Sequence, residues 1–428
     1  MMHGHTELVC TSGRDAAAAT RTGGMRRMSL SGHPVQDLIG EQTRAEIFAL
    51  VLTAGPISRT GLARRLGLAP STVTRLLPPL LDGDYLRETE TVPKGPGRPQ
   101  RFLEVNAERH VVVGVKIGPR LVSAVLTDMA ANVLARAEQA LADSTPATAL
   151  AAAAELTARL VAETAAERPH AADSVLGIGV GVSGHVDSAA GVCRYSAILD
   201  WQKVAVAEPL SRTTGLPVVV NNDVNTLVVA ERWFGQGRDI DSFAVVTVGS
   251  GIGCGLLLDG TLYSGSSGMA GELGHLPLDP RGPMCSCGRR GCLEALASEG
   301  AVLRQIRDAL PPTVAACPDI ATAMAWARNG GGARQAVSRS AFAEAGTALG
   351  RGLAGLCNLL NLQKIIIAGE GAVAHDLFGP AMTTALREHA FSEAAHDCDV
   401  QLDPVRDDLW ARGAACLVIR ETVRAPLS

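Results

Sequence analysis

Two patterns of apolar residues divide the chain. From about 41 to 106 they recur at helical spacing, with Ile47, Leu50, Val51 and Ala54 at positions i, i+3, i+4 and i+7. Beyond that segment, short apolar runs are typical of buried strands, with alanine-rich helices such as 147–167 between them: VVVGVKI, VLGIGVGV, PVVVNN, FAVVTVG, CGLLLDG and KIIIAGE. This alternation predicts an α/β architecture with layered sheets.

The amino-terminal pattern predicts three short helices. The first ends at Gly55, and Ser58 is a suitable N-cap for the second. Gly67 then allows a tight turn, and the third helix begins at Pro70. Two prolines follow Leu77, so we expect this helix to end or bend there, because an internal proline removes a backbone hydrogen bond.

The third helix has one polar face. Val73, Leu76 and Leu77 are expected to point inward. The outward positions carry side chains of the kind that reach bases or phosphates in a major groove: Ser71, Thr72, Thr74 and Arg75. This spacing predicts a helix-turn-helix. The segments YLRETE and RFLEVN, joined by the tip VPKGPGRPQ, predict a two-stranded wing after it.

Charge supports a DNA-facing role for this segment. The whole chain is slightly acidic, at −4, so its overall balance predicts no attraction to nucleic acid or to an anionic membrane. Residues 56–81 nevertheless contain four arginines and no acid, and residues 91–101 carry Lys94, Arg98 and Arg101 and no acid. Such local charge favours phosphate contacts, and the stiff segment 96–99 suits a minor groove. The alternative is a protein-interaction domain with a solvated basic face.

One short segment combines metal-binding residue types with acids. Between Glu272 and Glu294, the stretch ELGHLPLDPRGPMCSCGRRGCLE contains one histidine and three cysteines. They form a Cys3His set, which is the donor composition of a closed structural zinc site: His275, Cys285, Cys287 and Cys292. The other seven cysteines are scattered, which argues against a disulfide framework and favours a reducing, cytoplasmic compartment. The alternatives are free thiols and glutamates that are ordinary surface charge.

Polar and glycine-rich motifs surround this segment in a fixed order. NDVN (222–225) follows an apolar strand, GSGIG (249–253) lies between two strands, and AGELGH (270–275) leads into CSCGRRGCLE. Their order resembles that of the ROK family, named for repressors, open reading frames and sugar kinases. The resemblance covers nearly the whole chain from about Glu41 onward.

The resemblance implies a fold, a ligand and partners. It implies a winged helix-turn-helix followed by a two-lobed, actin-like or ribonuclease-H-like sugar-binding domain, typically homo-oligomeric and with a structural zinc ion (Zn2+). We therefore expect a flexible leader (1–36), a DNA-binding domain (37–106) and a ROK domain (107–428). By motif, the family's sugar contacts fall on Asn222, Asp223, Glu272, His275 and Glu294, and its zinc ligands fall on His275, Cys285, Cys287 and Cys292.

The chain departs from the kinases of the family at one loop. Those kinases open the α/β region with an Asp-x-Gly-x-Thr phosphate loop, whereas here Lys116 replaces the acid and Pro119 and Arg120 replace the end of the turn. Phosphoryl transfer depends on metal-assisted charge neutralisation, and a lysine cannot hold Mg2+. Asp223, at the position of the kinase base, remains. We expect no enzymatic activity, with a residual or bifunctional sugar kinase as the alternative.

The sequence as a whole predicts a sugar-responsive transcriptional regulator, most simply a repressor of carbohydrate utilisation genes. Its expected partners are a double-stranded DNA operator, a sugar or sugar-phosphate effector, and further copies of itself in a homodimer or homotetramer. No run of 18 apolar residues appears, so no membrane association is expected. The sequence leaves open the identity of the sugar, the operator, repression against activation, and dimer against tetramer.

Overall fold

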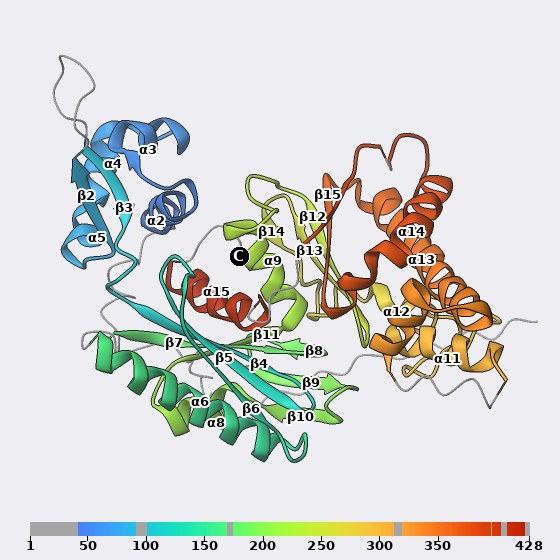
Figure 1. Cartoon of the computed structure of the whole chain (residues 1–428). Coiled ribbons are helices and arrows are strands. Elements are labelled where there is room, and N and C mark those ends of the chain that lie inside the picture. The colour runs from blue at the N-terminus through green and yellow to red at the C-terminus, as the bar shows by residue number, and fades with distance from the viewer. Residues whose placement is uncertain are drawn as a thin grey trace, which may run out of the picture.

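The computed structural model describes residues 42–90, 101–168, 174–311, 319–394, 396–403 and 409–423. The expected leader and the wing tip, with Lys94 and Arg98, lie outside these ranges. A small amino-terminal unit stands beside two larger lobes, and each lobe is built on a five-stranded sheet (Figure 1).

Within residues 42–90 and 101–105, the amino-terminal unit contains four helices and a three-stranded antiparallel sheet with the order β1-β3-β2. In chain order its elements are α2 (Gln42–Ala54), β1 (Ile57–Ser58), α3 (Arg59–Arg65), α4 (Pro70–Leu76), α5 (Pro78–Asp82), β2 (Leu86–Glu90) and β3 (Arg101–Val105). The Ser58 side chain accepts a hydrogen bond from the Gly61 amide, 3.1 Å long, so it caps α3 as expected. The expected break after Leu77 is also confirmed, because α5 begins at Pro78.

The core of this unit differs from the predicted pattern at one position. Val73, Leu76 and Leu77 are buried as expected, but Ala54 is exposed. Ala54 is the last residue of α2, where the chain turns away from the core. Phe48 is fully buried instead and lies edge-on to Tyr85, with ring centroids 6.4 Å apart. The buried face of α2 is therefore rotated toward Phe48.

The amino lobe contains a mixed sheet with the order β11-β7-β4-β5-β6. Its strands are β4 (Val111–Ile117), β5 (Leu121–Asp128), β6 (Val133–Ala140), β7 (Val175–Val182) and β11 (Val218–Asn222). Helices α6 (Pro146–Glu167) and α8 (Ala207–Thr214) cover one face, as Figure 1 shows. A small antiparallel sheet lies at one end: β8 (His185–Asp187), β9 (Val192–Ser196) and β10 (Trp201–Ala205).

Two glycines let the last described helix, α15 (Leu409–Val423), lie directly on the other face of this sheet. A Cβ added at Gly114 would lie 1.9 Å from the Ala411 carbonyl oxygen, and one at Gly179 would lie 1.8 Å from the Ala414 carbonyl oxygen. Only glycine permits this backbone approach. The apolar strands β4 and β7 therefore have their glycines where the helix packs.

The carboxyl lobe contains the sheet β14-β13-β12-β15-β16. Its strands are β12 (Phe243–Val248), β13 (Ile252–Leu258), β14 (Thr261–Leu262), β15 (Lys364–Ala368) and β16 (Asp399–Leu402). Helix α9 (Asp223–Phe234) contacts β12 and β13 and also packs on α15, so these two helices lie between the sheets. The opposite side is built from α10 (Leu293–Ala297), α11 (Glu299–Ala309), α12 (Ile320–Asn329), α13 (Gly332–Leu360) and α14 (His375–His389).

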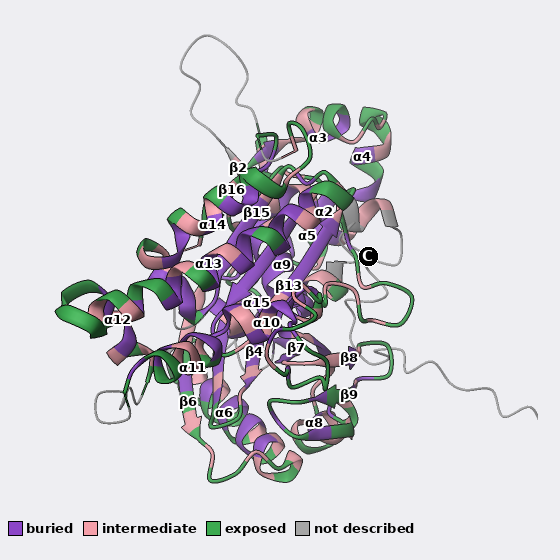
Figure 2. Cartoon of the chain, turned by 90° about the vertical axis from the view of Figure 1, so that its right-hand side faces the viewer, coloured by how far each residue is buried: buried purple, intermediate pink, exposed green. Residues whose placement is uncertain are grey.

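The observed strands follow the apolar runs closely. VVVGVKI and VLGIGVGV coincide with β4 and β7, while β13 begins two residues earlier than the run CGLLLDG. The central strands β4, β7, β12 and β15 are buried, whereas the helices expose their outer faces (Figure 2). Within the described ranges, no helix is long and apolar enough to cross a membrane.

Candidate functional site

The four metal-type residues converge in space. His275 ends the short 3-10 helix η1 (Leu273–His275), and Cys292 immediately precedes α10. The four candidate donor atoms all lie within 4.8 Å of one another. Cys285 Sγ is 3.6 Å from His275 Nδ1, and Cys287 Sγ is 3.7 Å from Cys292 Sγ.

These separations fit one tetrahedral metal ion. Zn–S bonds of about 2.3 Å and Zn–N bonds of about 2.0–2.1 Å place ligand atoms roughly 3.6–3.8 Å apart in a tetrahedron. The measured sulfur–nitrogen and sulfur–sulfur distances match those values. The set is therefore suited to a single ion with thiolate and imidazole ligands.

Backbone hydrogen bonds hold the cysteine loop against the short 3-10 helix. The Cys285 amide donates to the Arg289 carbonyl over 2.8 Å, and the Leu293 amide donates to the Leu276 carbonyl over 3.0 Å. The chain between the two glutamates therefore folds back on itself. The fold places Glu272 just before η1 and Glu294 in the first turn of α10.

The two glutamates lie beside the metal cluster. Glu272 Oε2 is 4.0 Å from His275 Nε2, the ring nitrogen that does not face Cys285. Glu294 accepts hydrogen bonds from the Ser286 hydroxyl, at 3.1 Å, and from the Ile252 amide, at 3.4 Å. Partial burial raises the pKa of Glu272, and the Glu294 charge adds to this, while the nearby imidazoles oppose it.

Asp223 is buried in a network of polar contacts at the start of α9. Its Oδ2 atom accepts a hydrogen bond from Ser183 Oγ, at 2.5 Å, and pairs with the Lys116 ammonium. Lys116 also donates to Ser183 Oγ over 3.1 Å. Burial alone would raise the pKa of Asp223, but the Lys116 charge and these hydrogen bonds hold it below its ordinary value.

Asn222 supports the same helix end. Its side-chain oxygen accepts from the amides of Val224 and Asn225, at 2.9 and 3.3 Å, so it caps α9. Its amide nitrogen donates to the Gly184 carbonyl over 2.9 Å. Asn222 therefore holds the start of α9 against the segment that follows β7.

His185 connects the two groups of residues, and the sequence analysis missed it. It follows Gly184 in the chain, and its Nε2 atom donates to the Ser267 carbonyl of the carboxyl lobe over 2.9 Å. The charge interaction with the His185 ring lowers the pKa of the Glu272 carboxyl. Ser183, Gly184 and His185 follow the buried strand β7, so the strand-end rule applied to NDVN would also have singled them out.

The polar and basic side chains of the amino-terminal unit differ in their surroundings: those of α4 face solvent, whereas two arginines pair with Glu88. Ser71, Thr74 and Arg75 are exposed on α4, and Thr72 is partly exposed. Arg101 pairs with Glu88 at 3.1 Å, on the strand opposite its own. Arg59 pairs with the same carboxylate at 2.5 Å. Part of the positive charge counted in the sequence is thus balanced by Glu88, whereas Arg64, Arg65 and Arg75 project into solvent.

Comparison with known proteins places the chain among regulators and kinases of one family. The ROK family model matches residues 112–421. A xylose repressor of Caldicellulosiruptor bescii is 25% identical over 396 residues, which cover 91% of this chain and 98% of the repressor. A glucokinase of Thermotoga maritima is 34% identical over 252 residues, which cover 56% of this chain and 78% of the kinase.

Among solved structures, a ROK family transcriptional regulator described as a homolog of the E. coli MLC protein superposes with a TM-score of 0.78. It is 27% identical, and the match covers 91% of this chain and 98% of that chain. The family model spans most of the sequence and both lobes. The chain therefore belongs to the ROK family.

Proposed function

We propose that this protein is a sugar-responsive DNA-binding transcriptional regulator, acting as a repressor. The observation that carries the proposal is the extent of the similarity to repressors. The matches cover 91% of the chain, which is a larger share than the residues after 111 make up. The similarity to repressors therefore includes much of the amino-terminal segment. The similarity to the glucokinase covers 56% of the chain.

The amino-terminal unit is the proposed DNA-binding domain (37–106). Support comes from the two short helices α3 and α4 on either side of the turn at Gly67, and from the antiparallel pairing of β2 with β3 after them, an order that suits a winged helix-turn-helix. The proposed contacts to DNA come from α4 and the wing: Ser71, Thr72, Thr74, Arg75, Lys94, Arg98 and Arg101. Support comes from the exposed polar face of α4 above a buried apolar face.

The remaining residues (107–428) form the proposed sugar-binding domain. Each sugar hydroxyl both donates and accepts, so carboxylates, amides and an imidazole in fixed positions suit it. The proposed contacts are Asn222, Asp223, Glu272, His275 and Glu294. Support comes from the fixed side chains of Asp223 and Glu294 and from His275 Nε2, which faces Glu272 and not the cysteines.

A structural zinc ion is the proposed metal, held by His275, Cys285, Cys287 and Cys292. When bound, the ion would cross-link the cysteine loop and fix the tautomer of the His275 imidazole. His275 Nδ1 lies on the metal side, and Nε2 is then free to meet a sugar hydroxyl. In this way the loop that holds the metal would also position the ligand.

The proposed regulator is not a kinase, because its phosphate loop is degenerate. The carboxylate that would act as base toward a sugar hydroxyl is instead paired with Lys116 and bonded to Ser183. An ionised, hydrogen-bonded carboxylate with a lowered pKa is a weaker base. The lysine also occupies the position where the kinases have a metal-binding acid.

Helix packing offers a route from the sugar site to the DNA-binding unit. Asn222 and Asp223 lie at the start of α9, α9 packs on α15, and α15 contacts α2 of the amino-terminal unit. A sugar that changes the position of α9 can therefore change the placement of that unit. In a homodimer or homotetramer, this would alter the spacing between two DNA-binding units and so the operator affinity.

One experiment tests the proposal. The full-length protein is used to select binding duplexes from random DNA, and binding of the selected duplex is then titrated with a panel of free and phosphorylated sugars. We expect salt-sensitive DNA binding that at least one sugar weakens, with no ADP formed from ATP and the same sugars. A failure to select DNA, or steady phosphorylation abolished by Asp223→Asn, would overturn the proposal in favour of the kinase alternative.

A further inference from the structure

The Glu88 carboxylate on β2 joins two arginines that come from different elements of the amino-terminal unit. Its Oε1 atom accepts hydrogen bonds from Arg59 Nε, at 2.9 Å, and from Arg59 Nη2, at 2.5 Å. Its Oε2 atom accepts from Arg101 Nη1 at 3.1 Å. Arg59 is the first residue of α3 and Arg101 is the first residue of β3, so one carboxylate connects α3 to the antiparallel pair of β2 and β3.

The register of the two strands sets the face on which this cluster lies. Glu88 is opposite Leu103, and Arg101 is two residues before Leu103, so these three side chains share one face of the sheet. Leu103 is fully buried, and the two charged residues lie at the margin of the core. A second ion pair, between Arg87 and Glu104, is one position along and therefore lies on the other face.

The two guanidiniums are more exposed than the carboxylate that they share. The Glu88 side chain is 20% exposed, whereas Arg59 and Arg101 are 38% and 62% exposed. An anion that approaches from solvent therefore meets the guanidinium groups before it meets the carboxylate. Two guanidiniums and one carboxylate also leave one net positive charge in the cluster, whereas the pair of Arg87 with Glu104 is neutral.

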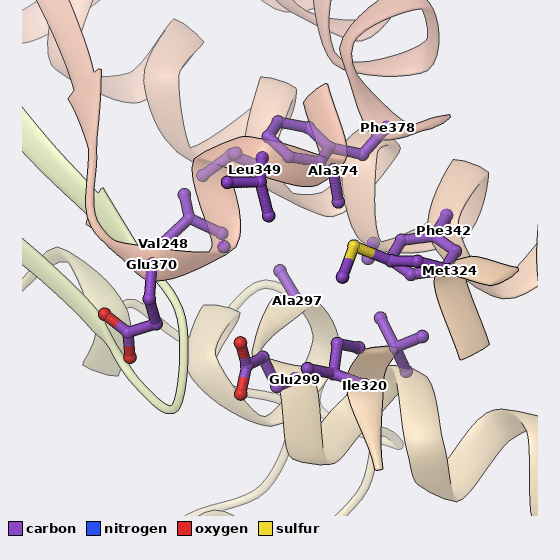
Figure 3. A pocket seen from close by; sticks show the side chains of 14 residues that line it. Val248, Ala297, Glu299, Ile320, Met324, Phe342, Leu349, Glu370, Ala374 and Phe378 are labelled. Atoms are coloured by element: carbon purple, nitrogen blue, oxygen red, sulfur yellow. The ribbon is translucent and has the colours of Figure 1, made fainter. Parts of the chain in front are cut away.

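The two arginines keep the Glu88 carboxyl ionised. Burial alone would raise its pKa, but the hydrogen bonds and charges of Arg59 and Arg101 lower it below its ordinary value. Glu299 provides a contrast, because it lines one side of a cavity in the carboxyl lobe together with Glu370 (Figure 3). There burial raises the pKa of Glu299, and the Glu370 charge raises it further. Glu88 is therefore a stable anion at neutral pH that attracts both guanidiniums at once.

An arginine held in this way is prepared to bind a phosphate. A guanidinium carries N–H groups on more than one edge, so one edge can face a carboxylate while another faces a second anion. Arg59 uses Nε and Nη2 for Glu88, and Nη1 takes part in neither of these bonds. A side chain that is already fixed loses less conformational freedom when it binds its partner. The cost of ordering two long side chains is thus met before any DNA arrives.

We propose that Glu88 is a positioning residue for DNA binding, which holds Arg59 and Arg101 as a paired contact for the phosphate backbone of double-stranded DNA. Arg59 thereby joins the proposed DNA contacts. The pair contributes affinity and orientation and no sequence preference, because phosphate contacts carry no base information. This inference rests on the proposed DNA-binding function of the amino-terminal unit.

Removal of the Glu88 charge distinguishes positioning from simple repulsion of DNA. Glu88→Gln keeps the shape of the side chain, but its amide accepts from one arginine and offers only N–H groups to the other. If charge alone mattered, the loss of a negative charge would tighten DNA binding. We expect instead that Glu88→Gln weakens binding about three- to tenfold and reduces the slope of log affinity against log salt by about one. Fluorescence anisotropy of the full-length protein with a selected duplex measures both.

The matched control is Glu104→Gln. It removes the same charge from the same pair of strands, but on the other face, so it should not weaken binding. Arg59→Ala should weaken binding about as much as Glu88→Gln, because it removes one member of the paired contact. Unchanged or tighter binding by Glu88→Gln, or an equal weakening by Glu104→Gln, would overturn the proposal.

A double variant separates positioning from a purely structural role. If Glu88 acts through Arg101, then Arg101→Ala should weaken binding less in the Glu88→Gln background than in wild type. Additive losses, or a Glu88→Gln protein that changes only in melting temperature, would reject the inference. Arg75→Ala serves as the reference for the proposed function. If Arg75→Ala weakens binding and Glu88→Gln does not, only the role of Glu88 is wrong; if neither does, the DNA-binding assignment itself is wrong.

Discussion

The Lys116 ammonium and the Asp223 carboxylate form an ion pair in the amino lobe, between a strand and the first residue of α9. Their side chains are 16% and 8% exposed, and Ser183 bonds to both. Lys116 also lies 4.7 Å from the ring centroid of Trp410 on α15. The pair therefore fixes α9 relative to the sheet and to α15.

Removal of either partner should destabilise the protein. Lys116→Met leaves a buried carboxylate unpaired, and Asp223→Asn leaves a buried ammonium unpaired, so each should lower the free energy of unfolding by about 3 kcal/mol. The double variant should lose less than the sum, because it leaves no uncompensated charge. Urea unfolding of the three variants measures this coupling.

A surface pair provides the control for that cycle. Arg212 and Glu208 are 71% and 56% exposed on α8, so their coupling energy should be close to zero. If the double variant of Lys116 and Asp223 loses as much free energy of unfolding as the two single variants together, the buried pair is not coupled.

The contrast between Lys116 and Ser58 shows what sequence can and cannot predict here. The cap at Ser58 and the helix start at Pro70 depend on neighbours within a few residues, so local spacing was sufficient. Lys116 was recognisable as a departure from the kinase loop, but its partner lies 107 residues away. Only the pairing of β4, β7 and β11 brings the two together.

The same distinction holds at the candidate site. The cysteine loop was predictable because its four donors lie within 18 residues of one another, whereas His185 reaches the carboxyl lobe through a bond that spans 82 residues. Arg101 was counted as free positive charge because its partner Glu88 lies across a strand pair that the charge count ignores. Ala54 fits a helical period but lies at the end of α2, where the core stops.

Loss of one thiolate should release the metal. Cys287→Ser is expected to lower the zinc content from about one ion per chain to near zero and the melting temperature by several degrees, because metal binding contributes folding free energy. Metal analysis and thermal unfolding measure both effects. Cys193→Ala, at a buried cysteine outside the cluster, should retain its metal. An unchanged metal content in Cys287→Ser would reject the zinc site.

The exposed arginine of α4 should contribute to operator binding. Arg75→Ala and Arg98→Ala are each expected to weaken binding about tenfold, and each lost phosphate contact should reduce the slope of log affinity against log salt by about one. Fluorescence anisotropy at several salt concentrations measures both quantities. Arg212→Ala, which removes an exposed arginine from α8, should leave them unchanged. Wild-type affinity in both test variants would refute the DNA-facing assignment.

The sugar response should depend on Glu272. Glu272→Ala removes a hydroxyl acceptor beside His275, so we expect it to abolish the sugar's effect on operator binding while DNA affinity without sugar stays the same. The comparison is Glu163→Ala, since Glu163 is 58% exposed on α6 and Glu272 is 52% exposed. A Glu272→Ala protein that still responds to the sugar would exclude this residue from the ligand site.

A buried acid on α9 should make stability depend on pH. Glu231 is 4% exposed, and burial, with the charge of Asp403, raises its pKa to about 7. In the unfolded chain its pKa is about 4.3. The native state therefore binds the proton more tightly, and the stabilisation is present at low pH and is lost as the pH rises through about 7.

Glu231→Gln removes this dependence, because the amide is neutral at every pH and can still accept the Gln236 amide bond, which is 2.7 Å long. Relative to wild type, its free energy of unfolding should increase by about 2–3 kcal/mol between pH 5 and pH 8. Urea unfolding across that range measures the difference, with Glu208→Gln as an exposed control. Parallel curves for wild type and Glu231→Gln would show that Glu231 is already ionised throughout, and that α9 tolerates a buried charge between the two sheets.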